Sequence, residues 1–238
     1  MADTETTTFK RKKKYTTSFS NVPQEQAERI LGFQFVPFYY QQEPLDQFIT
    51  EKAPDSLKKE IFNRLVDCIE SEGYPEASLS PLNEAVVTDY VGHILQPMVA
   101  HFNCSRTRKD IELTRETQII SRDEEEDENM EFVVMHSIDV DNVRYVNVIE
   151  AKRGALGDGL TQLLLALKSA FGINNDQKKV YGFLTTAIDW QLITYDGQTW
   201  KLSRTSTLLY GNMDKEEDQW SKDNTQILDM IYSILSSL

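Results

Sequence analysis

Three consecutive strand-like segments lie between two amphipathic helical segments, and this order constrains the fold of the 238-residue chain more than any other feature. Residues that favour β-strands are frequent in all three segments, at residues 110–121, 131–138 and 143–152. Apolar residues recur at helical spacing before them, from residue 80, and after them, at residues 158–171. A further strand is expected at residues 179–186. We therefore predict an α/β fold with a mixed sheet flanked by helices.

The part of the chain before residue 80 differs from this core in composition. Residues 1–20 have no apolar period, so they predict a disordered tail. Residues 21–79 predict a helical N-terminal extension, whose clearest element is an amphipathic helix at residues 56–72 that ends at Gly73. We thus expect a tail, a helical extension and an α/β domain over residues 80–238.

The composition predicts a folded protein in a reducing compartment. Hydrophobic residues make up 40% and aromatic residues 10% of the chain, which is enough for a large core and excludes wholesale disorder. No apolar run approaches the ~18 residues that a membrane span needs, so no membrane interaction is expected. Cys68 and Cys104 are too few for a disulfide framework or a cysteine metal site. The consecutive basic residues from Lys10 to Lys14 indicate a nuclear protein, and otherwise they form a solubilising tail of a cytoplasmic one.

The charge balance is strongly acidic. A net charge of −13 at pH 7 opposes non-specific attraction to nucleic acid. A nucleic-acid function would therefore need a local basic surface, for which the candidates next to the strands are Arg106, Arg108, Lys109, Arg153, Lys168, Lys178 and Lys179. The acids run consecutively from Asp123 to Glu128 (residues 123–128) and predict a solvated, mobile loop that would repel DNA or bind a basic protein partner.

Glu150 and Lys152 are the most informative pair of residues. They end the third strand-like segment two residues apart, so both side chains project from the same face of a strand. Val146 and Val148 alternate onto that face and indicate that it points inward. A buried carboxylate and ammonium are costly for structure alone, but phosphodiester hydrolysis uses both, one to hold a divalent metal and one to orient water. The structural alternative is an ordinary ion pair at a sheet edge.

Two further acids are candidates for the same place. If the second and third strands pair around a turn at residues 139–142, Glu131 lies opposite Glu150, with the Cβ atoms about 5 Å apart. Glu84 falls on the apolar stripe of the preceding helix, where a carboxylate needs a partner or a metal. The structural alternatives are that Glu131 ends the acidic run and that Glu84 is a first-turn glutamate favoured by the helix dipole.

These residues form a pattern that resembles the PD-(D/E)xK nuclease superfamily, which has the restriction-endonuclease-like fold. The pattern consists of Asn83-Glu84, Met130-Glu131, Glu150-Ala151-Lys152 and Gln162, and the resemblance covers about residues 80–205. It implies an αβββαβ core, here with an N-terminal helical appendage. Two positions depart from the family, because Met130 and Glu131 replace the usual Pro and Asp. A weaker likeness, to nuclease-like domains of Crinkler-type fungal and protist proteins, lies in residues 180–200.

The resemblance implies a divalent-metal-dependent nuclease that hydrolyses DNA or RNA, with DNA favoured. Glu84, Glu131 and Glu150 would bind Mg²⁺ or Mn²⁺. Lys152 would position the attacking water and Gln162, unless it is an ordinary surface amide, would orient the site. The alternative is a catalytically inactive protein of the same fold that acts as a nuclear or cytosolic interaction module, which the acidic charge and the Met130-Glu131 substitution favour.

Overall fold

The computed structural model describes residues 17–75, 84–105, 109–120, 126–139, 142–152, 154–174 and 176–238. Its helices are α1 (Gln24–Leu31), α2 (Phe35–Tyr39), α3 (Asp55–Glu72), α4 (Glu84–Ser105), α5 (Leu160–Ile173), α6 (Glu217–Asp223) and α7 (Gln226–Ser236). The short 3₁₀ turns are η1 (Phe19–Asn21), η2 (Leu45–Phe48), η3 (Leu156–Gly159) and η4 (Met213–Lys215). The strands are β1 (Thr17–Ser18), β2 (Gln42–Glu43), β3 (Ile111–Ile120), β4 (Glu126–Asp139), β5 (Asn142–Ala151), β6 (Val180–Thr185), β7 (Asp189–Tyr195), β8 (Trp200–Ser203) and β9 (Ser206–Thr207).

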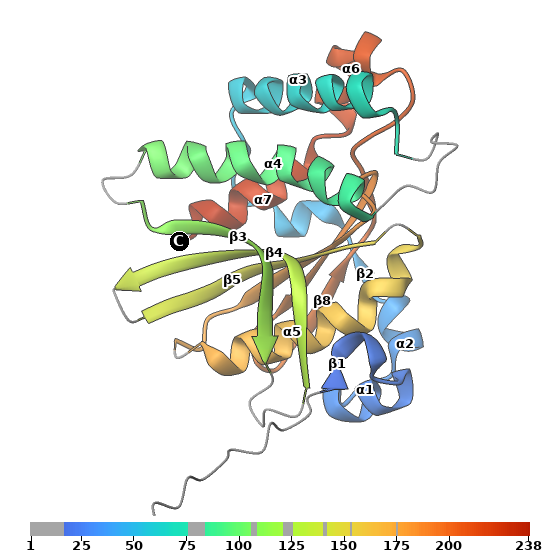
Figure 1. Cartoon of the computed structure of the whole chain (residues 1–238), viewed down its shortest axis with the longest axis vertical. Coiled ribbons are helices and arrows are strands. Elements are labelled where there is room, and N and C mark those ends of the chain that lie inside the picture. The colour runs from blue at the N-terminus through green and yellow to red at the C-terminus, as the bar shows by residue number, and fades with distance from the viewer. Residues whose placement is uncertain are drawn as a thin grey trace, which may run out of the picture.

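Within the described residues, a mixed sheet of nine strands forms the middle of three layers (Figure 1). One face is covered by α4 and α7, with α3 packed on the outer side of α4, and the other face is covered by α5, on which α1 packs. The order of helix, three strands, helix and strand expected from residue 80 is present as α4, β3, β4, β5, α5 and β6. The predicted α/β class, with a mixed sheet flanked by helices, is thus confirmed.

The sheet consists of two antiparallel meanders joined by one parallel pair. β3, β4 and β5 form the first meander, and β6, β7 and β8 form the second. β5 and β6 are parallel, because α5 carries the chain back across one face before β6 begins. β1 pairs with β4 and β2 pairs with β8, both in parallel.

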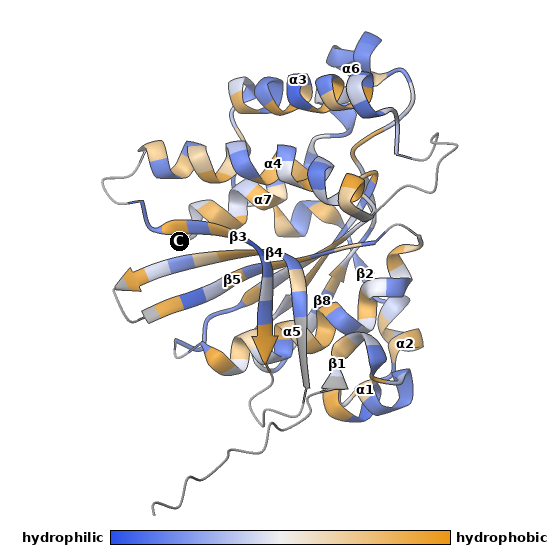
Figure 2. Cartoon of the chain, in the orientation of Figure 1, coloured by the Kyte–Doolittle hydropathy of each residue, from blue (hydrophilic) through white to orange (hydrophobic). Residues whose placement is uncertain are grey.

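Each face of the sheet has its own hydrophobic core. Leu65, Ile94 and Ile231 lie in the core beneath α3, α4 and α7, whereas Val148 and Leu163 lie in the core beneath α5. In Figure 2, α5, which packs on the sheet, is largely hydrophobic, whereas the outlying α6 is largely hydrophilic. Within the described residues, none of the helices has the length and apolar character that a membrane crossing requires.

The pairing of β4 with β5 follows the predicted register at both ends. Phe132 pairs with Ile149, and Asp139 pairs with Asn142 at the turn. Between these points the register shifts twice, and the second shift cancels the first. The predicted alignment of the two strands beside the candidate acids is therefore confirmed, although the sequence gives no sign of the two irregularities.

The N-terminal segment is more closely joined to the sheet than its composition predicts. Residues 17–20 fall in the expected disordered tail, but β1 pairs with β4 and Phe19 is fully buried. The tail prediction was wrong for these residues, because one aromatic ring that finds a core outweighs its polar neighbours. β2 belongs to the sheet and α3 to its core, so the helical extension shares the core of the α/β domain. The basic cluster from Lys10 to Lys14 lies outside the described residues.

The acidic run also differs from its prediction. β4 begins at Glu126, and Asp127 pairs with Ile120 of β3 and with Ser18 of β1. The expectation of a loop over residues 123–128 is therefore wrong for residues 126–128, while residues 123–125 lie outside the described residues. A strand pairs through backbone hydrogen bonds and does not need its side chains to pack, so a run of acids can belong to one.

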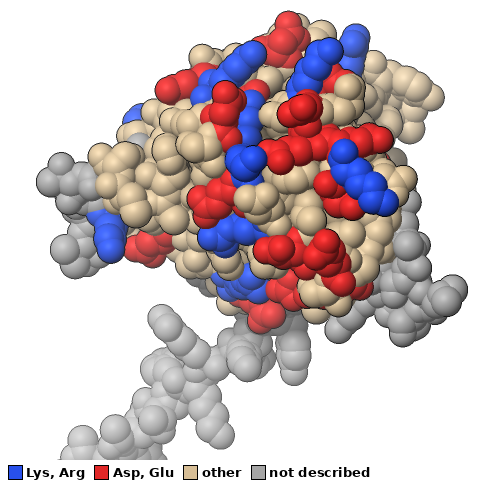
Figure 3. All heavy atoms as spheres, turned by 90° about the horizontal axis from the view of Figure 1, so that it is seen from above, with Lys and Arg blue, Asp and Glu red and all other residues tan. Residues whose placement is uncertain are grey.

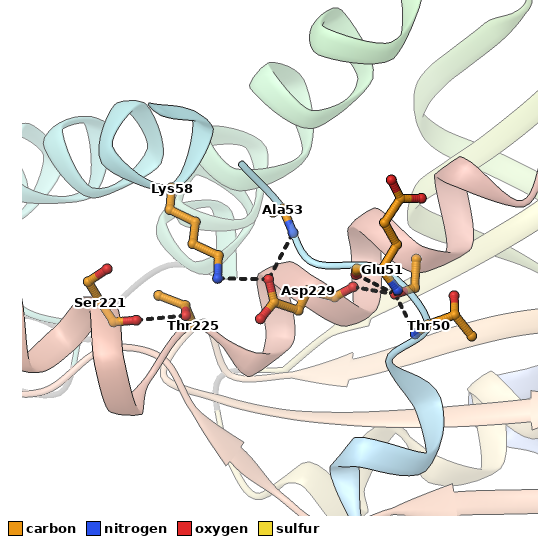
Figure 4. A network of polar contacts seen from close by, with 8 residues as sticks. Thr50, Glu51, Ala53, Lys58, Ser221, Thr225 and Asp229 are labelled. Atoms are coloured by element: carbon orange, nitrogen blue, oxygen red, sulfur yellow. Dashed lines mark hydrogen bonds and ion pairs between the residues drawn. The ribbon is translucent and has the colours of Figure 1, made fainter. Parts of the chain in front are cut away.

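A buried polar network fastens the N-terminal segment to α7 (Figure 4). The ammonium of Lys58 lies 2.8 Å from Oδ1 of Asp229, and the amide of Ala53 donates to the same oxygen at 2.9 Å. One turn further along α7, the hydroxyl of Ser233 accepts from the amide of Thr50 at 3.0 Å. These contacts satisfy the backbone of an irregular segment that would otherwise bury unpaired donors.

Candidate functional site

The C-terminal end of β5 and the neighbouring interior of β4 bring three of the predicted site residues together. Oε2 of Glu131 accepts a hydrogen bond of 3.3 Å from the amide of Ala151, which places Glu131 beside the end of β5. Oε1 of Glu150 lies 2.5 Å from Nζ of Lys152. The alternation of strand side chains and the register of the β4–β5 hairpin therefore place Glu131, Glu150 and Lys152 as the sequence predicted.

Glu150 is fully buried at this site, with 0% of its surface exposed, whereas the Lys152 side chain is 19% exposed. A Cβ on Gly159 would lie 2.9 Å from Cγ of Glu150 and 3.0 Å from Cγ of Lys152, so η3 lies directly against both side chains. Neither carboxylate oxygen of Glu150 accepts a well-directed hydrogen bond from the part of the chain that the structure describes. The ion pair with Lys152 leaves this buried carboxyl group incompletely satisfied.

The two carboxyl groups have perturbed pKa values. Burial, strengthened by the neighbouring Glu131, raises the pKa of Glu150 to about 9, although the Lys152 ammonium acts in the opposite direction. Burial also raises the pKa of Glu131. The groups interact and so titrate as a pair that keeps a proton at neutral pH. Removing this proton would leave two buried negative charges beside one ammonium, which a divalent cation could neutralise.

An open cavity of about 370 Å³ adjoins Glu131. Its wall comes from the first turns of α4, from the middle of β3 and from β4, through Thr88, Asp89, Arg115, Glu116, Asn129 and Glu131. β3 is irregular at this point because Glu116 has a left-handed backbone, with φ of 50°. The cavity thus gives solvent access to one side of the carboxyl pair.

The remaining two predicted site residues lie on the helices that flank this place. Glu84 is the first residue of α4 and its side chain lies outside the described residues, but the following residue, Ala85, lines the cavity with Glu131. Gln162 is buried in the first turn of α5, which begins directly after Gly159. Among the described residues, no group of three or more His, Cys, Asp or Glu side chains is arranged to hold a metal ion.

The basic residues near the site differ from those that the sequence suggested. The ammonium of Lys168 donates to the carbonyl of Ile30, so it fastens α5 to α1. Arg106, Arg108 and Arg153 lie outside the described residues. Among the described residues, the cation that lines the cavity is Arg115, in the middle of β3, which the sequence did not single out. On the face formed by α3 and α6, Lys and Arg side chains alternate with Asp and Glu (Figure 3).

Comparison with protein families and with curated proteins identifies no relative of this chain. No protein-family model matches the chain, and no curated protein is significantly similar to it. The function of the protein is therefore inferred from the chemistry of Glu131, Glu150 and Lys152 and from the cavity beside them.

Proposed function

We propose that this protein is a divalent-metal-dependent nuclease with a restriction-endonuclease-like core. The observation that carries the proposal is the group of Glu131, Glu150 and Lys152, where the interior of β4 lies beside the C-terminal end of β5. A buried carboxyl group that its neighbours among the described residues satisfy incompletely, next to a second carboxyl and an open cavity, is the environment that a hard divalent cation completes. The order α4, β3, β4, β5, α5 and β6 matches the αβββαβ core that the proposal requires.

The proposed roles follow from position and charge. Glu131 and Glu150 would hold Mg²⁺ or Mn²⁺ through their carboxylates, and Glu84 at the start of α4 would assist through a second ion or a bridging water. When bound, the cation supplies positive charge to the phosphate oxygens and lowers the pKa of a water molecule. Lys152 orients the attacking water and offsets the negative charge that develops on the phosphate. Gln162 at the start of α5 would orient the site.

The second candidate is a catalytically inactive protein of the same fold that binds a partner. The close ion pair between Lys152 and Glu150 supports it, because it partly neutralises the site without a metal. The net charge of −13 and the acidic run support a basic protein as the partner. A nuclear location and a preference for DNA belong to the first candidate and are proposals as well.

Cleavage assays on Lys152→Ala test the nuclease directly. We expect the wild type to cleave DNA or RNA in Mg²⁺ or Mn²⁺, and the variant to lose at least about 100-fold in rate because the charge of the transition state is no longer offset. Lys222→Ala, which removes an exposed lysine in the last turn of α6, is the matched control and should cleave normally. A wild-type protein that cleaves neither nucleic acid in either metal would contradict the proposal.

Calorimetric titration with Mn²⁺ separates the two candidates. A nuclease is expected to bind Mn²⁺ at micromolar concentration, and Glu150→Gln should lose this binding while Glu112→Gln, an exposed glutamate of β3, keeps it. The carboxyl pair must release its proton to bind a cation, so the affinity should rise with pH, by up to about tenfold per pH unit between about pH 6 and pH 8. No binding by the wild type would favour the inactive protein.

A further inference from the structure

The guanidinium of Arg115 is the positive group that lines the cavity beside Glu131 in the described part of the chain. We propose that it binds the phosphate of a nucleic-acid phosphodiester placed in this cavity, between itself and the cation held by Glu131 and Glu150. The inference rests on the proposed nuclease function and adds a binding residue that the sequence pattern does not contain.

Three contacts hold the Arg115 guanidinium in place. Its Nη1 lies 3.3 Å from Oδ1 of Asp89 on α4, and its Cζ lies 5.0 Å from the centroid of the Phe132 ring on β4. On the third side, a Cβ on Gly92 would lie only 2.6 Å from Nη2. The guanidinium therefore passes over α4 at the one position where that helix has no side chain.

These contacts are costly for a purely structural role. Glycine inside a helix destabilises it relative to alanine, and Gly92 lies within α4. The left-handed backbone of the neighbouring Glu116 is a further strained position. In return the structure gains an ion pair whose side chains are 46% and 49% exposed, and such exposed pairs contribute little stability. The cation–π contact with the Phe132 ring adds little more at a half-exposed guanidinium, so the two strained positions are only weakly compensated, which is typical of a functional position.

The donors of Arg115 fit a phosphate. Arginine has five N–H donors in a planar fork, and among the described residues a single hydrogen bond, to Asp89, uses one of them. A guanidinium fork is the group that binds two phosphate oxygens at once. The cavity of about 370 Å³ falls within the size range of pockets that bind small ligands.

The charge of the cavity predicts when the phosphate binds. Asp89, Glu116 and Glu131 also line it, so Arg115 alone does not make the cavity positive. A phosphate should therefore enter only when a divalent cation occupies the carboxyl pair. This requirement links Arg115 to the proposed metal site and determines the conditions of the test.

The test measures binding of a short, fluorescently labelled DNA, single-stranded and duplex, by anisotropy in Ca²⁺, so that no cleavage is needed. We expect Arg115→Gln to weaken binding about tenfold and to reduce the slope of log affinity against log salt by about 0.7 to 0.9, the amount for one phosphate contact. Gly92→Ala keeps the charge but displaces the guanidinium, and it should weaken binding as well. Arg64→Gln is the matched control, because Arg64 is 40% exposed and paired with Glu60 on α3, away from the cavity.

Each other result overturns the inference. Unchanged affinity in Arg115→Gln shows that Arg115 does not contact the phosphate. An effect of Arg115→Gln without any effect of Gly92→Ala shows that overall charge, and not a held guanidinium in this cavity, attracts the DNA. A wild type that binds neither DNA in Ca²⁺ excludes the site, and circular dichroism of every variant identifies a loss of fold.

The outcomes also separate this inference from the proposed nuclease. If Arg115→Gln binds DNA like the wild type while Lys152→Ala still abolishes cleavage, the nuclease stands and the role of Arg115 is wrong. If Arg115-dependent DNA binding is found without cleavage in Mg²⁺ or Mn²⁺, the phosphate site stands and the nuclease is wrong.

Discussion

Two buried pairs of a lysine and a carboxylate differ in how completely they are satisfied. Lys58 and Asp229, whose side chains are 8% and 7% exposed, form the centre of the network between α3 and α7 (Figure 4). Oδ1 of Asp229 accepts from the amide of Ala53 as well as contacting Lys58. Lys152 and Glu150 are also close, but neither oxygen of Glu150 accepts a well-directed hydrogen bond within the described chain.

The difference separates a structural ion pair from a candidate site. A buried charge is tolerated when neighbouring donors replace the water that it loses, and the backbone around Asp229 does this. At Glu150 a second carboxyl lies where a donor would be expected, and the pKa of Glu150 rises to about 9. Residue types alone do not distinguish the two pairs, whereas their surroundings do.

The largest effect that we expect comes from breaking the fully satisfied pair of Lys58 and Asp229. Asp229→Ala leaves the Lys58 ammonium buried without its carboxylate and removes the acceptor of the Ala53 amide. Losing one partner of a buried pair destabilises by about 3–5 kcal/mol, so the free energy of unfolding in urea should fall by this amount. Lys59→Ala, which removes the exposed partner of Glu217, is the control and should unfold close to the wild-type midpoint. Equal losses in the two variants would contradict the comparison.

The second expected effect is a gain in stability, from replacing Glu150 of the less satisfied pair. The pKa of Glu150 is raised from 4.5 to about 9 in the folded protein, so the stability that this group contributes is complete below about pH 4.5 and is lost as the pH rises towards 9. Glu150→Gln removes this loss. In the absence of metal, the free energy of unfolding of the variant should therefore exceed that of the wild type by an amount that grows with pH, on the order of 1 kcal/mol per pH unit.

Urea unfolding of both proteins in EDTA, at several pH values within this window, measures the effect. A Glu150→Gln variant that is less stable than the wild type throughout would show that Glu150 is as well satisfied as Asp229. Asp229→Asn serves as the parallel variant, because the same change at the complete pair should destabilise the protein at every pH.

The smallest expected effect on stability tests how closely η3 packs against the pair of Glu150 and Lys152. Gly159→Ala would place a Cβ 2.7 Å from Cδ1 of Leu184 and 2.9 Å from Cγ of Glu150, and such overpacking should lower the free energy of unfolding by about 1–2 kcal/mol. Gly157 lies in the same turn and a Cβ there would meet nothing within 4 Å. Gly157→Ala should therefore match the wild type, and an equal loss in both variants would argue against close packing at Gly159.

The candidate site was predictable to the extent that it depends on neighbours along the chain and on one hairpin. Glu150 and Lys152 share a face because strand side chains alternate. Glu131 reaches Glu150 because the β4–β5 turn sets the register, and the two irregularities between them cancel. The strand at residues 126–128 and the burial of Phe19 were not predictable. Both depend on β1, which comes from a distant part of the sequence, pairing with β4.

The amino-acid sequence by itself determined the order of elements, the hairpin register and the pairing of Glu150 with Lys152, since local periodicity and turn position decide them. Only the tertiary structure decided that the Glu150 oxygens accept no well-directed hydrogen bond within the described residues, that η3 covers this side chain and that Arg115 passes over Gly92. Those features arise where α4, the sheet and α5 pack together, and packing depends on contacts between residues far apart in the chain, which a pattern of residue types does not encode.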